Sequence, residues 1–517
     1  MYPVGQTLGQ PANFRQSAPE IWWQSRVCDF CYSGTVPNQL VIPVPEIREM
    51  GRAALDLVAE YYDTLATRAV LRPSTSADVR RLLDEPAPAT GQPFAELLDT
   101  VRNVVERYSR HAAHRRCFGY VSSPGTPVAA MGSMIAAAYT SNVTGWRSGR
   151  AASEMELLCI RWIKEMIGYP AEGMGLLVSG GSMANFAGIA AARSAKAPGN
   201  VVRDGMGGTC MRLYVSEEAH FSNRKAAAML GIGADNARAV KTDANLRMDL
   251  ADLELQVRKD RDAGHLPFCV VASAGTAGTG AMDPIGAIAD FAKANNLWLH
   301  VDGAYGGFSA MAPSARDFFR RIGEADSVAL DPHKWLYLPV GCGCVLYRDP
   351  AAARAAFSEN AEYTRVVGLE GDDAFIFWDY GPELTRPFRA LNLWLLLKTA
   401  GTEAIAEAIE NNIACAKYFA ELVRGTDDFE MLAPVDLSIF CFRYRPRGFS
   451  DDLDALNERI MLEVQRAGSS YLSNARVRGV FALRGCVLNY RTTKRDMEIL
   501  LEDVRNAVRA VQGTLAG

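Results

Sequence analysis

The chain has 517 residues, of which 49% are apolar, so it is long enough for about three domains around a large hydrophobic core. Its 55 Lys and Arg against 59 Asp and Glu give a formal net charge of -4, without the basic excess typical of nucleic-acid or membrane-surface binding. Eleven scattered cysteines make no disulfide framework, and neither a membrane span nor a signal peptide is visible. We therefore expect a cytoplasmic protein whose partners are small molecules or copies of itself, with no nucleic acid and no membrane.

The N-terminal region predicts an irregular arm over residues 1–44, because Pro and Gly interrupt every helical or strand period there. Its aromatic residues, Trp22, Trp23, Phe30 and Tyr32, favour packing on another subunit. From Pro45 the apolar residues follow helical spacing, and a second amphipathic helix is expected from Phe94 to Val105. We therefore expect a helical segment over residues 45–128.

The middle of the chain predicts a large domain over residues 129–391, in which short apolar runs alternate with helical patterns. Strands joined by crossover helices form a parallel sheet that is buried on both faces. The predicted strands are Leu176–Val178, Leu213–Val215, Cys269–Ala272, Leu297–Val301, Val328–Leu330 and Cys344–Tyr347. Residues 392–517 predict a small α/β domain, with strands at Ser438–Arg443 and Cys486–Tyr490 and a helix from Asp452.

Polar or glycine-rich clusters follow five consecutive predicted strands. They are Ser179 to Ser182, Ser216 to His220, Gly275 with Thr276, Asp302, and Asp331 to Lys334. Ligands on parallel sheets bind beyond the carboxyl ends of the strands, so we expect these clusters to meet around a ligand.

Each cluster also has a purely structural interpretation. Gly180-Gly181-Ser182 before a helix is a tight turn with Ser182 as its N-cap, or a site where free backbone amides bind a phosphate. Asp302 ends a buried strand, and a buried carboxylate requires a cationic partner. Lys334 lies beside Trp335 in apolar sequence, where formation of an imine is a reason to bury an ammonium group.

Taken together, the clusters predict a coenzyme with a phosphate, a pyridinium nitrogen and an aldehyde, which is pyridoxal 5'-phosphate (PLP). Ser182 and the glycines would hold the phosphate. Asp302 would keep the ring nitrogen protonated, Lys334 would form the imine, and His220 would stack on the ring. A scaffold protein without a coenzyme would have no need of both Lys334 and Asp302.

The segments His300 to Gly307 and Asp331 to Trp335 resemble the group II PLP-dependent amino acid decarboxylases, which include aromatic-amino-acid and glutamate decarboxylases. The resemblance runs from about Pro45 to the C-terminus. It implies the PLP-dependent transferase fold (fold type I), with a central, mostly parallel seven-stranded sheet. It also implies a homodimer with the active site at the interface.

Carried over residue by residue, the resemblance implies Lys334 as the Schiff-base lysine, Asp302 as the partner of the ring nitrogen and His220 as the stacking residue. Tyr363 would donate a proton after CO2 leaves. The further cofactor-binding residues would be Gly181, Ser182, Thr276, Ala304, His333 and Thr385, the last from the other side of the dimer. The substrate pocket would include Tyr120, Ser122, Asn142 and Trp146.

The implied reaction is decarboxylation of an L-amino acid to its amine. Tyr120 and Trp146 favour an aromatic substrate, namely tryptophan, tyrosine, phenylalanine or DOPA. Arg147 and Arg150 leave open an acidic substrate, namely glutamate, aspartate or cysteine sulfinate. An aldehyde synthase that uses the same coenzyme residues is a further alternative, against which Tyr363 argues. A lyase for phosphorylated sphingoid bases would usually bring a membrane anchor, and none is visible.

The sequence departs from the family pattern at Ala277, where a second Thr is usual, and at Arg150, where Pro is usual. No two of the six histidines have the His-Glu-x-x-His spacing, and the Cys28-x-x-Cys31 pair lacks a second pair. We therefore expect no metal site.

Overall fold

The computed structural model describes residues 40–359, 375–449 and 451–515. By their contacts these residues belong to two units, one ending at Asp56 and one beginning at Leu57. The described part of the first unit is the start of helix α1 (Val44–Thr64), which agrees with the helical pattern predicted from Pro45. Within the described ranges, no helix is both long and apolar enough to span a lipid bilayer.

The second unit contains a seven-stranded sheet in the order β1-β7-β6-β5-β4-β2-β3. Four of its strand pairs are parallel, and β7 runs antiparallel to both of its neighbours. The sheet is therefore mostly parallel, as predicted. Its strands are β1 (Met174–Val178), β2 (Met211–Ser216), β3 (Ala237–Val240), β4 (Leu266–Ser273), β5 (Trp298–Gly303), β6 (Ser327–Leu330) and β7 (Gly343–Tyr347).

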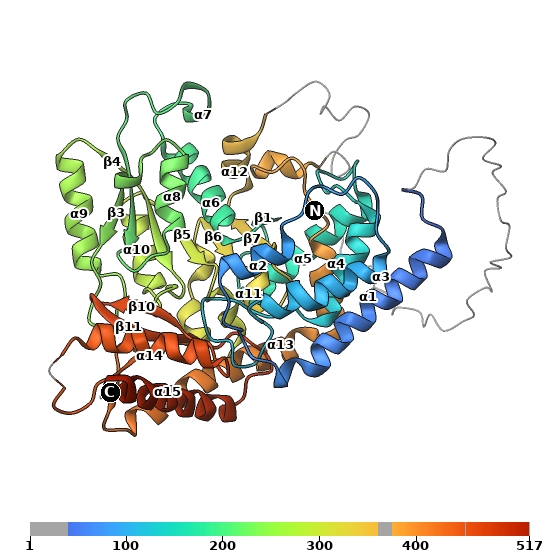
Figure 1. The fold of residues 1–517 in the computed structure, drawn as a ribbon. Coiled ribbons are helices and arrows are strands. Elements are labelled where there is room, and N and C mark those ends of the chain that lie inside the picture. The colour runs from blue at the N-terminus through green and yellow to red at the C-terminus, as the bar shows by residue number, and fades with distance from the viewer. Residues whose placement is uncertain (1–39, 360–374, 450, 516–517) are drawn as a thin grey trace, which may run out of the picture. The chain divides into compact units, whose positions relative to one another are not determined.

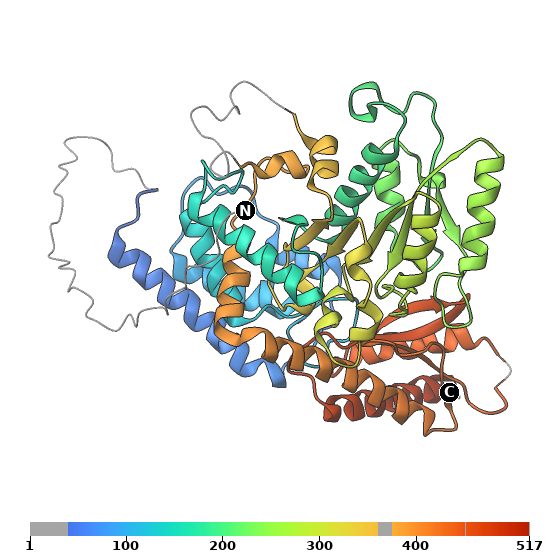
Figure 2. The ribbon, with the colours of Figure 1, turned by 180° about the vertical axis from the view of Figure 1, so that it is seen from behind.

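Helices flank this sheet, as Figures 1 and 2 show, with α6 and α8 on one side of the strands and α9 on the other. Strands buried on both faces need apolar residues in nearly every position, which explains the short apolar runs of the sequence. The helices are α5 (Arg150–Ile167), α6 (Gly181–Lys196), α7 (Val201–Asp204), α8 (Ser222–Met229), α9 (Leu250–Asp262), α10 (Ile285–Ala294), α11 (Pro332–Trp335) and α12 (Pro350–Phe357).

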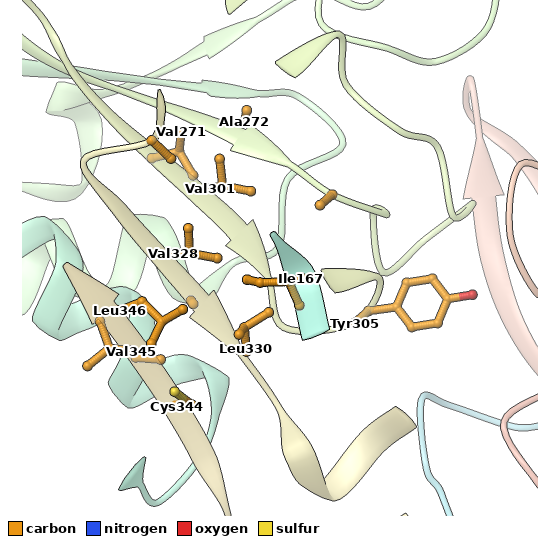
Figure 3. Close-up of a cluster of buried hydrophobic side chains, with 14 of the residues drawn as sticks. Ile167, Val271, Ala272, Val301, Tyr305, Val328, Leu330, Cys344, Val345 and Leu346 are labelled. Atoms are coloured by element: carbon orange, nitrogen blue, oxygen red, sulfur yellow. The ribbon is translucent and has the colours of Figure 1, made fainter. Parts of the chain in front are cut away.

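The core of the sheet is built from aliphatic side chains of neighbouring strands (Figure 3). Val271, Val301, Val328 and Leu330 are fully buried there. Tyr305 follows β5, and its hydroxyl lies 2.8 Å from the Ser438 hydroxyl, so it connects this core to the C-terminal part of the chain.

Three of the helices that precede the sheet expose much of their apolar surface. They are α2 (Ser76–Leu83), α3 (Phe94–Thr100), which continues into a π-helix at Val101–Glu106, and α4 (Pro127–Tyr139). The amphipathic helix predicted from Phe94 to Val105 is present, but no residue in it is buried. Within the described ranges, the short 3-10 helices are Leu65–Thr67, Ala234–Asn236, Gly307–Met311, Arg316–Phe319, Ile322–Glu324 and Phe377–Tyr380.

The C-terminal part of the chain has an antiparallel four-stranded sheet in the order β10-β11-β9-β8, packed against helices. Its strands are β8 (Phe429–Met431), β9 (Ile439–Tyr444), β10 (Ser473–Val477) and β11 (Val480–Cys486), and its helices are α13 (Ala390–Arg424), α14 (Leu453–Ala467) and α15 (Lys494–Leu515). The domain boundary predicted at residue 391 therefore lies inside α13, which is interrupted at Gly401 by a positive φ of 77°.

The strand predicted over Cys486–Tyr490 is wrong, because β11 ends at Cys486. Pairing with β9 stops there, at the contact of Cys486 with Ile439. The Asn489 side chain then donates to the carbonyls of Ala113 and His114 at 3.0 and 3.1 Å, so this segment is bound to the N-terminal part of the unit and not to a strand.

Candidate active site

A cavity of about 770 Å³ lies at the carboxyl ends of the sheet strands. This volume is in the range of small-molecule sites. Parallel strands bring their carboxyl ends to one edge of the sheet, so polar clusters that are far apart in sequence meet there. The predicted site residues among its lining are Tyr120, Gly181, Ser182, His220, Thr276, Asp302, Ala304, His333 and Lys334.

The glycine-rich turn between β1 and α6 forms one wall of the cavity. The N-cap of α6 is Gly180, and no side chain caps this end of the helix. The interpretation of Ser182 as an N-cap is therefore wrong, and its exposed side chain lies among the lining residues. A Cβ atom on Gly181 would lie 2.6 Å from Cβ of Ala304 and 2.7 Å from Oδ2 of Asp331, so only glycine fits there. Free amides at a helix start and an adjacent hydroxyl suit a phosphate.

Lys334 lies in α11, directly after β6, as the sequence predicted. Its Nζ atom is 2.8 Å from Oδ2 of Asp331, and the side chains are 19% and 3% exposed. The second carboxylate oxygen of Asp331 is buried and has no hydrogen-bond partner among the described residues. The lysine amine therefore lies inside the cavity beside a buried counter-ion.

Asp302, in β5, is buried and held by donors from two helices. Its Oδ2 atom accepts hydrogen bonds from the side-chain amides of Asn185 (2.9 Å) and Asn223 (3.2 Å). Its Oδ1 atom accepts the backbone N–H of Ala304 at 3.2 Å, which leaves this oxygen with acceptor capacity toward the cavity. The carboxylate is thus ready to accept a ring N–H.

His220 follows β2 and stands beside the exposed ring of Phe221, with the two ring centroids 4.2 Å apart. Burial lowers the pKa of His220, so the neutral ring is favoured. Its Nδ1 atom lies 2.7 Å from the Ser222 hydroxyl and also accepts the Ser222 backbone N–H. The ring proton therefore sits on Nε2, which is free to act as a donor.

The residues of the cavity fit PLP. Two buried polar atoms among its lining residues, Oγ of Ser273 and Oδ1 of Asp331, lack hydrogen-bond partners in the part of the chain that the structure describes. Buried polar atoms are rarely left without partners, so a polar ligand is expected. The glycine turn, Lys334 and Asp302 supply what the phosphate, the aldehyde and the ring nitrogen of PLP require.

Not all predicted residues line this cavity. Asn142 and Thr385 line a separate cavity of about 480 Å³, and the Asn142 side chain accepts the backbone N–H of Arg386 at 2.9 Å. Ser122 accepts a hydrogen bond from Arg110 at 3.3 Å, and the Trp146 ring lies under the Arg150 guanidinium at 4.8 Å. The hydroxyl of Thr276 is engaged within its own loop by Thr279, at 2.9 Å. Tyr363 lies outside the described residues, as do Cys28 and Cys31.

Sequence reasoning missed the contribution of the C-terminal sheet. Arg484 of β11 is 4% exposed, and its guanidinium donates to the carbonyls of Tyr120, Ala277 and Gly278 at 3.1, 2.6 and 2.9 Å. It thereby holds two walls of the cavity together. The sequence signal that could have identified Arg484 is a single arginine within the apolar run of β11. Four β10 residues, Ser473 to Arg476, also line the cavity.

Comparison with known proteins gives the same assignment. The model of the pyridoxal-dependent decarboxylase conserved domain matches residues 77–445. An aromatic-L-amino-acid decarboxylase of Bacillus atrophaeus is 32% identical over 462 residues, which cover 89% of this chain and 95% of that protein. The chain therefore belongs to the pyridoxal-dependent decarboxylase family. It is a carboxy-lyase, and its coenzyme is PLP.

Solved structures agree with this assignment. The crystal structure of Oryza sativa TDC with PLP and tryptamine matches with a TM-score of 0.85 at 28% identity, covering 92% of this chain and 99% of that one. Catharanthus roseus tryptophan decarboxylase in complex with L-tryptophan matches with a TM-score of 0.84 at 25% identity, covering 91% and 99%. The predicted fold type I is thereby confirmed.

Proposed function

We propose that this protein decarboxylates an aromatic L-amino acid to the corresponding amine and CO2. The observation that carries the proposal is the presence of Lys334, Asp302 and His220 in one cavity beside the glycine turn at the start of α6. The curated relatives include aromatic-L-amino-acid, tryptophan and tyrosine decarboxylases, and their substrates support the aromatic class.

When bound, PLP supplies an aldehyde that links to an amine and a protonated ring that accepts the electrons of the broken bond. The Lys334 amine provides the point of attachment, and Asp331 is its counter-ion when the amine is free. Asp302 would hold the proton on the ring nitrogen. His220 would lie against the ring, and its Nε2–H would be available to orient the substrate carboxylate.

The arginines that line the cavity already have partners within the chain, which supports an aromatic substrate over an acidic one. Arg147 and Arg150 do not line the cavity of their own chain. Of the two arginines that do, Arg484 is bound to backbone carbonyls, and Arg476 pairs with Asp454 at 3.1 Å and donates to the Gly479 carbonyl at 2.8 Å. Reading a side-chain carboxylate requires an available guanidinium fork.

The experiment that tests the proposal is a panel of L-amino acids assayed for CO2, amine and peroxide with the PLP-loaded enzyme. We expect CO2 and amine in equal amounts, fastest with tryptophan, tyrosine, phenylalanine or DOPA. A preference for glutamate, aspartate or cysteine sulfinate would contradict the aromatic assignment. Aldehyde and peroxide in place of amine would identify an aldehyde synthase.

We propose further that the protein acts as a homodimer. Helix α4 exposes Met134, Ile135 and Tyr139, which are 58%, 37% and 68% exposed. Clustered apolar side chains on a surface favour a protein interface. Asn142 and Thr385, which the family resemblance places in an active site, line a second cavity next to α4. A second copy of the chain would cover this face. Asn142 and Thr385 of one subunit would then lie at the active site of the other subunit.

Sedimentation of wild type and of Met134→Glu tests the dimer. The wild type is expected to sediment as a dimer and the variant to dissociate, because a charge at the centre of an apolar interface is costly. A fully active monomeric wild type at nanomolar concentration would contradict the proposal.

We also propose a cytoplasmic location. The nine cysteines in the described ranges are all unpaired, the state that a reducing compartment maintains. Fractionation of the source cells tests it, and recovery of the protein outside the cytoplasm would contradict it.

A further inference from the structure

A chain of hydrogen bonds joins residues of β5 and β6 to helix α6 and ends at Asp302. Trp298 Nε1 donates to the Ser327 hydroxyl at 2.8 Å, and this hydroxyl lies 2.8 Å from Nδ1 of His300. Nε2 of His300 lies 2.9 Å from Oδ1 of Asn185, whose amide nitrogen donates to Asp302 at 2.9 Å. His300 and Ser327 are 0% exposed and Asn185 is 1% exposed.

The partners fix the direction of every proton in this chain. The indole N–H of Trp298 is only a donor, so the Ser327 hydroxyl accepts from it and directs its own proton to Nδ1 of His300. Burial lowers the pKa of His300 to about 4, so its ring is neutral with the proton on Nε2. That N–H donates to Oδ1 of Asn185, whose NH2 group must face the acceptor Asp302. All the donors therefore point toward the Asp302 carboxylate.

The packing of α6 makes room for this chain. A Cβ atom at Gly188 would lie 2.5 Å from Cε1 of His300 and 3.1 Å from the Ser327 hydroxyl. Gly188 and Asn185 are three residues apart, so they lie on the same face of α6. Gly188 leaves room for the imidazole ring of His300, and Asn185 accepts the hydrogen bond from its Nε2–H.

The same amide also connects to His220. The second N–H of Asn185 donates to the Ser222 hydroxyl at 3.0 Å, and this hydroxyl lies 2.7 Å from Nδ1 of His220. Since the Ser222 hydroxyl accepts from Asn185, its own proton points at His220. Asn185 is therefore connected to both side chains that the proposed function places against the coenzyme ring.

We propose that His300 is a positioning residue that acts through Asn185 to keep Asp302 a charged carboxylate and to fix the His220 ring. The proposal rests on the PLP-dependent function proposed above. Hydrogen bonds to a carboxylate favour its charged form, and a chain of them strengthens each member. If the hydrogen bonds to Asp302 were weakened, the proton between the buried carboxylate and the ring nitrogen would favour the carboxyl group. Both partners would then be neutral. The ring would then accept electrons poorly.

The test compares His300→Leu, which removes the donor, with His300→Gln, which can place an amide N–H near the position of Nε2. Each variant is loaded with PLP that carries ¹⁵N in its ring, and the nitrogen chemical shift is measured. We expect the wild-type shift to report a protonated ring and that of His300→Leu to move toward the unprotonated value. We expect kcat to fall about 10- to 100-fold in His300→Leu, the range found when a residue that orients a metal ligand is removed, with KM changed less than about threefold. His300→Gln should recover most of both losses.

Tyr214→Phe is the matched control. It removes another buried hydrogen bond in the same sheet, from the Tyr214 hydroxyl to Asp260 at 2.9 Å, without touching the chain that leads to Asp302. It should leave the nitrogen shift at the wild-type value even where the protein is less stable.

A wild-type nitrogen shift and kcat in His300→Leu would overturn the proposal. If that variant does not fold, Ser327→Ala is measured in the same way, because it deletes only the hydroxyl that donates to His300. A nitrogen shift in the same direction supports the proposal, and an unchanged shift overturns it. The measurement needs bound coenzyme but no turnover. A wild type that binds PLP without decarboxylating would thus refute the proposed function and leave this inference testable.

Discussion

Asp302 and Asp331 are the buried carboxylates of the cavity, and their partners give them different roles. Asp302 is held by donors from Asn185, Asn223 and Ala304, and under the proposed function it would be a fixed acceptor for the ring nitrogen. Asp331 contacts Lys334 instead. Under the proposed function, Asp302 would act on the ring nitrogen of PLP and Asp331 on the amine of Lys334.

This difference predicts the behaviour of Asp302→Asn. The variant should still bind PLP through Lys334, but kcat should fall at least about 100-fold, in the range of losing a main electrostatic contact. Absorbance of the bound coenzyme and the rate of CO2 release check this. Undiminished turnover would show that Asp302 does not hold the ring proton.

Tyr363 is another residue for which a substitution gives a clear prediction. It lies outside the described residues, and its role rests on the sequence resemblance. A phenol that delivers a proton after CO2 leaves suppresses reaction with oxygen. We expect Tyr363→Phe to release CO2 slowly and to yield aldehyde, ammonia and peroxide in place of amine. Amine at the wild-type rate without peroxide would assign the proton to another donor, with His220 or His333 as the next candidates.

Sequence could predict Lys334 and Asp302 because their chemical types are unusual where they stand, directly after buried strands. It could not predict Arg484 or Asn185 as site residues. Arg484 acts by contacting the Gly278 carbonyl 206 positions away, and Asn185 by contacting Asp302 117 positions away. Such roles exist only once the chain is folded.

At the scale of elements, a buried ion pair joins the segment before α13 to α5. The side chains of Arg386 and Glu156 are 0% and 1% exposed, and the arginine also donates to the carbonyls of Val143 and Leu177, both at 2.8 Å. Removing one partner of such a pair leaves a charge buried without compensation.

Arg386→Met should therefore lower the free energy of unfolding by about 3 to 5 kcal/mol in denaturant titrations. The matched control is Arg466→Met, whose pair with Glu463 on the surface of α14 has a 70% exposed arginine. The control should change stability by less than about 1 kcal/mol. Equal effects in the two variants would mean that the buried pair contributes no more than the exposed one.

Two of the strands that sequence missed are short or polar. β3 has only four residues, and β10 reads Ser-Asn-Ala-Arg-Val, without an apolar run. β11 does have an apolar run, but the prediction placed its strand too late in the chain, over Cys486–Tyr490. β7 runs antiparallel to β6, and the segment between them holds only the one-turn helix α11. The apolar run of β7 predicted a strand there but not its direction.

At the scale of the whole molecule, buried histidines couple stability to pH. Burial lowers the pKa of His114 and of His300 to about 4, against 6.5 for an exposed histidine. Between these values the unfolded chain binds more protons than the folded one, so stability is fully present above pH 6.5 and is lost as the pH falls toward 4.

We expect each of these histidines to lower the free energy of unfolding by about 1.4 kcal/mol for every pH unit by which the pH falls in this window. His114→Gln should reduce the slope of unfolding free energy against pH by about that amount, as measured by denaturant titration between pH 7 and pH 4. An unchanged slope would mean that His114 is not buried in its neutral form. The difference from wild type isolates the histidine from the carboxylates that titrate in the same range.

The central claim is that the cavity at the strand ends holds PLP on Lys334. The most direct measurement is borohydride reduction of the purified protein, followed by peptide mapping by mass spectrometry, in wild type and in Lys334→Ala. The account predicts one reduced coenzyme per chain, attached to the peptide that contains Lys334, and no adduct in the variant. A stoichiometric adduct on another lysine, or one that persists in Lys334→Ala, would contradict it.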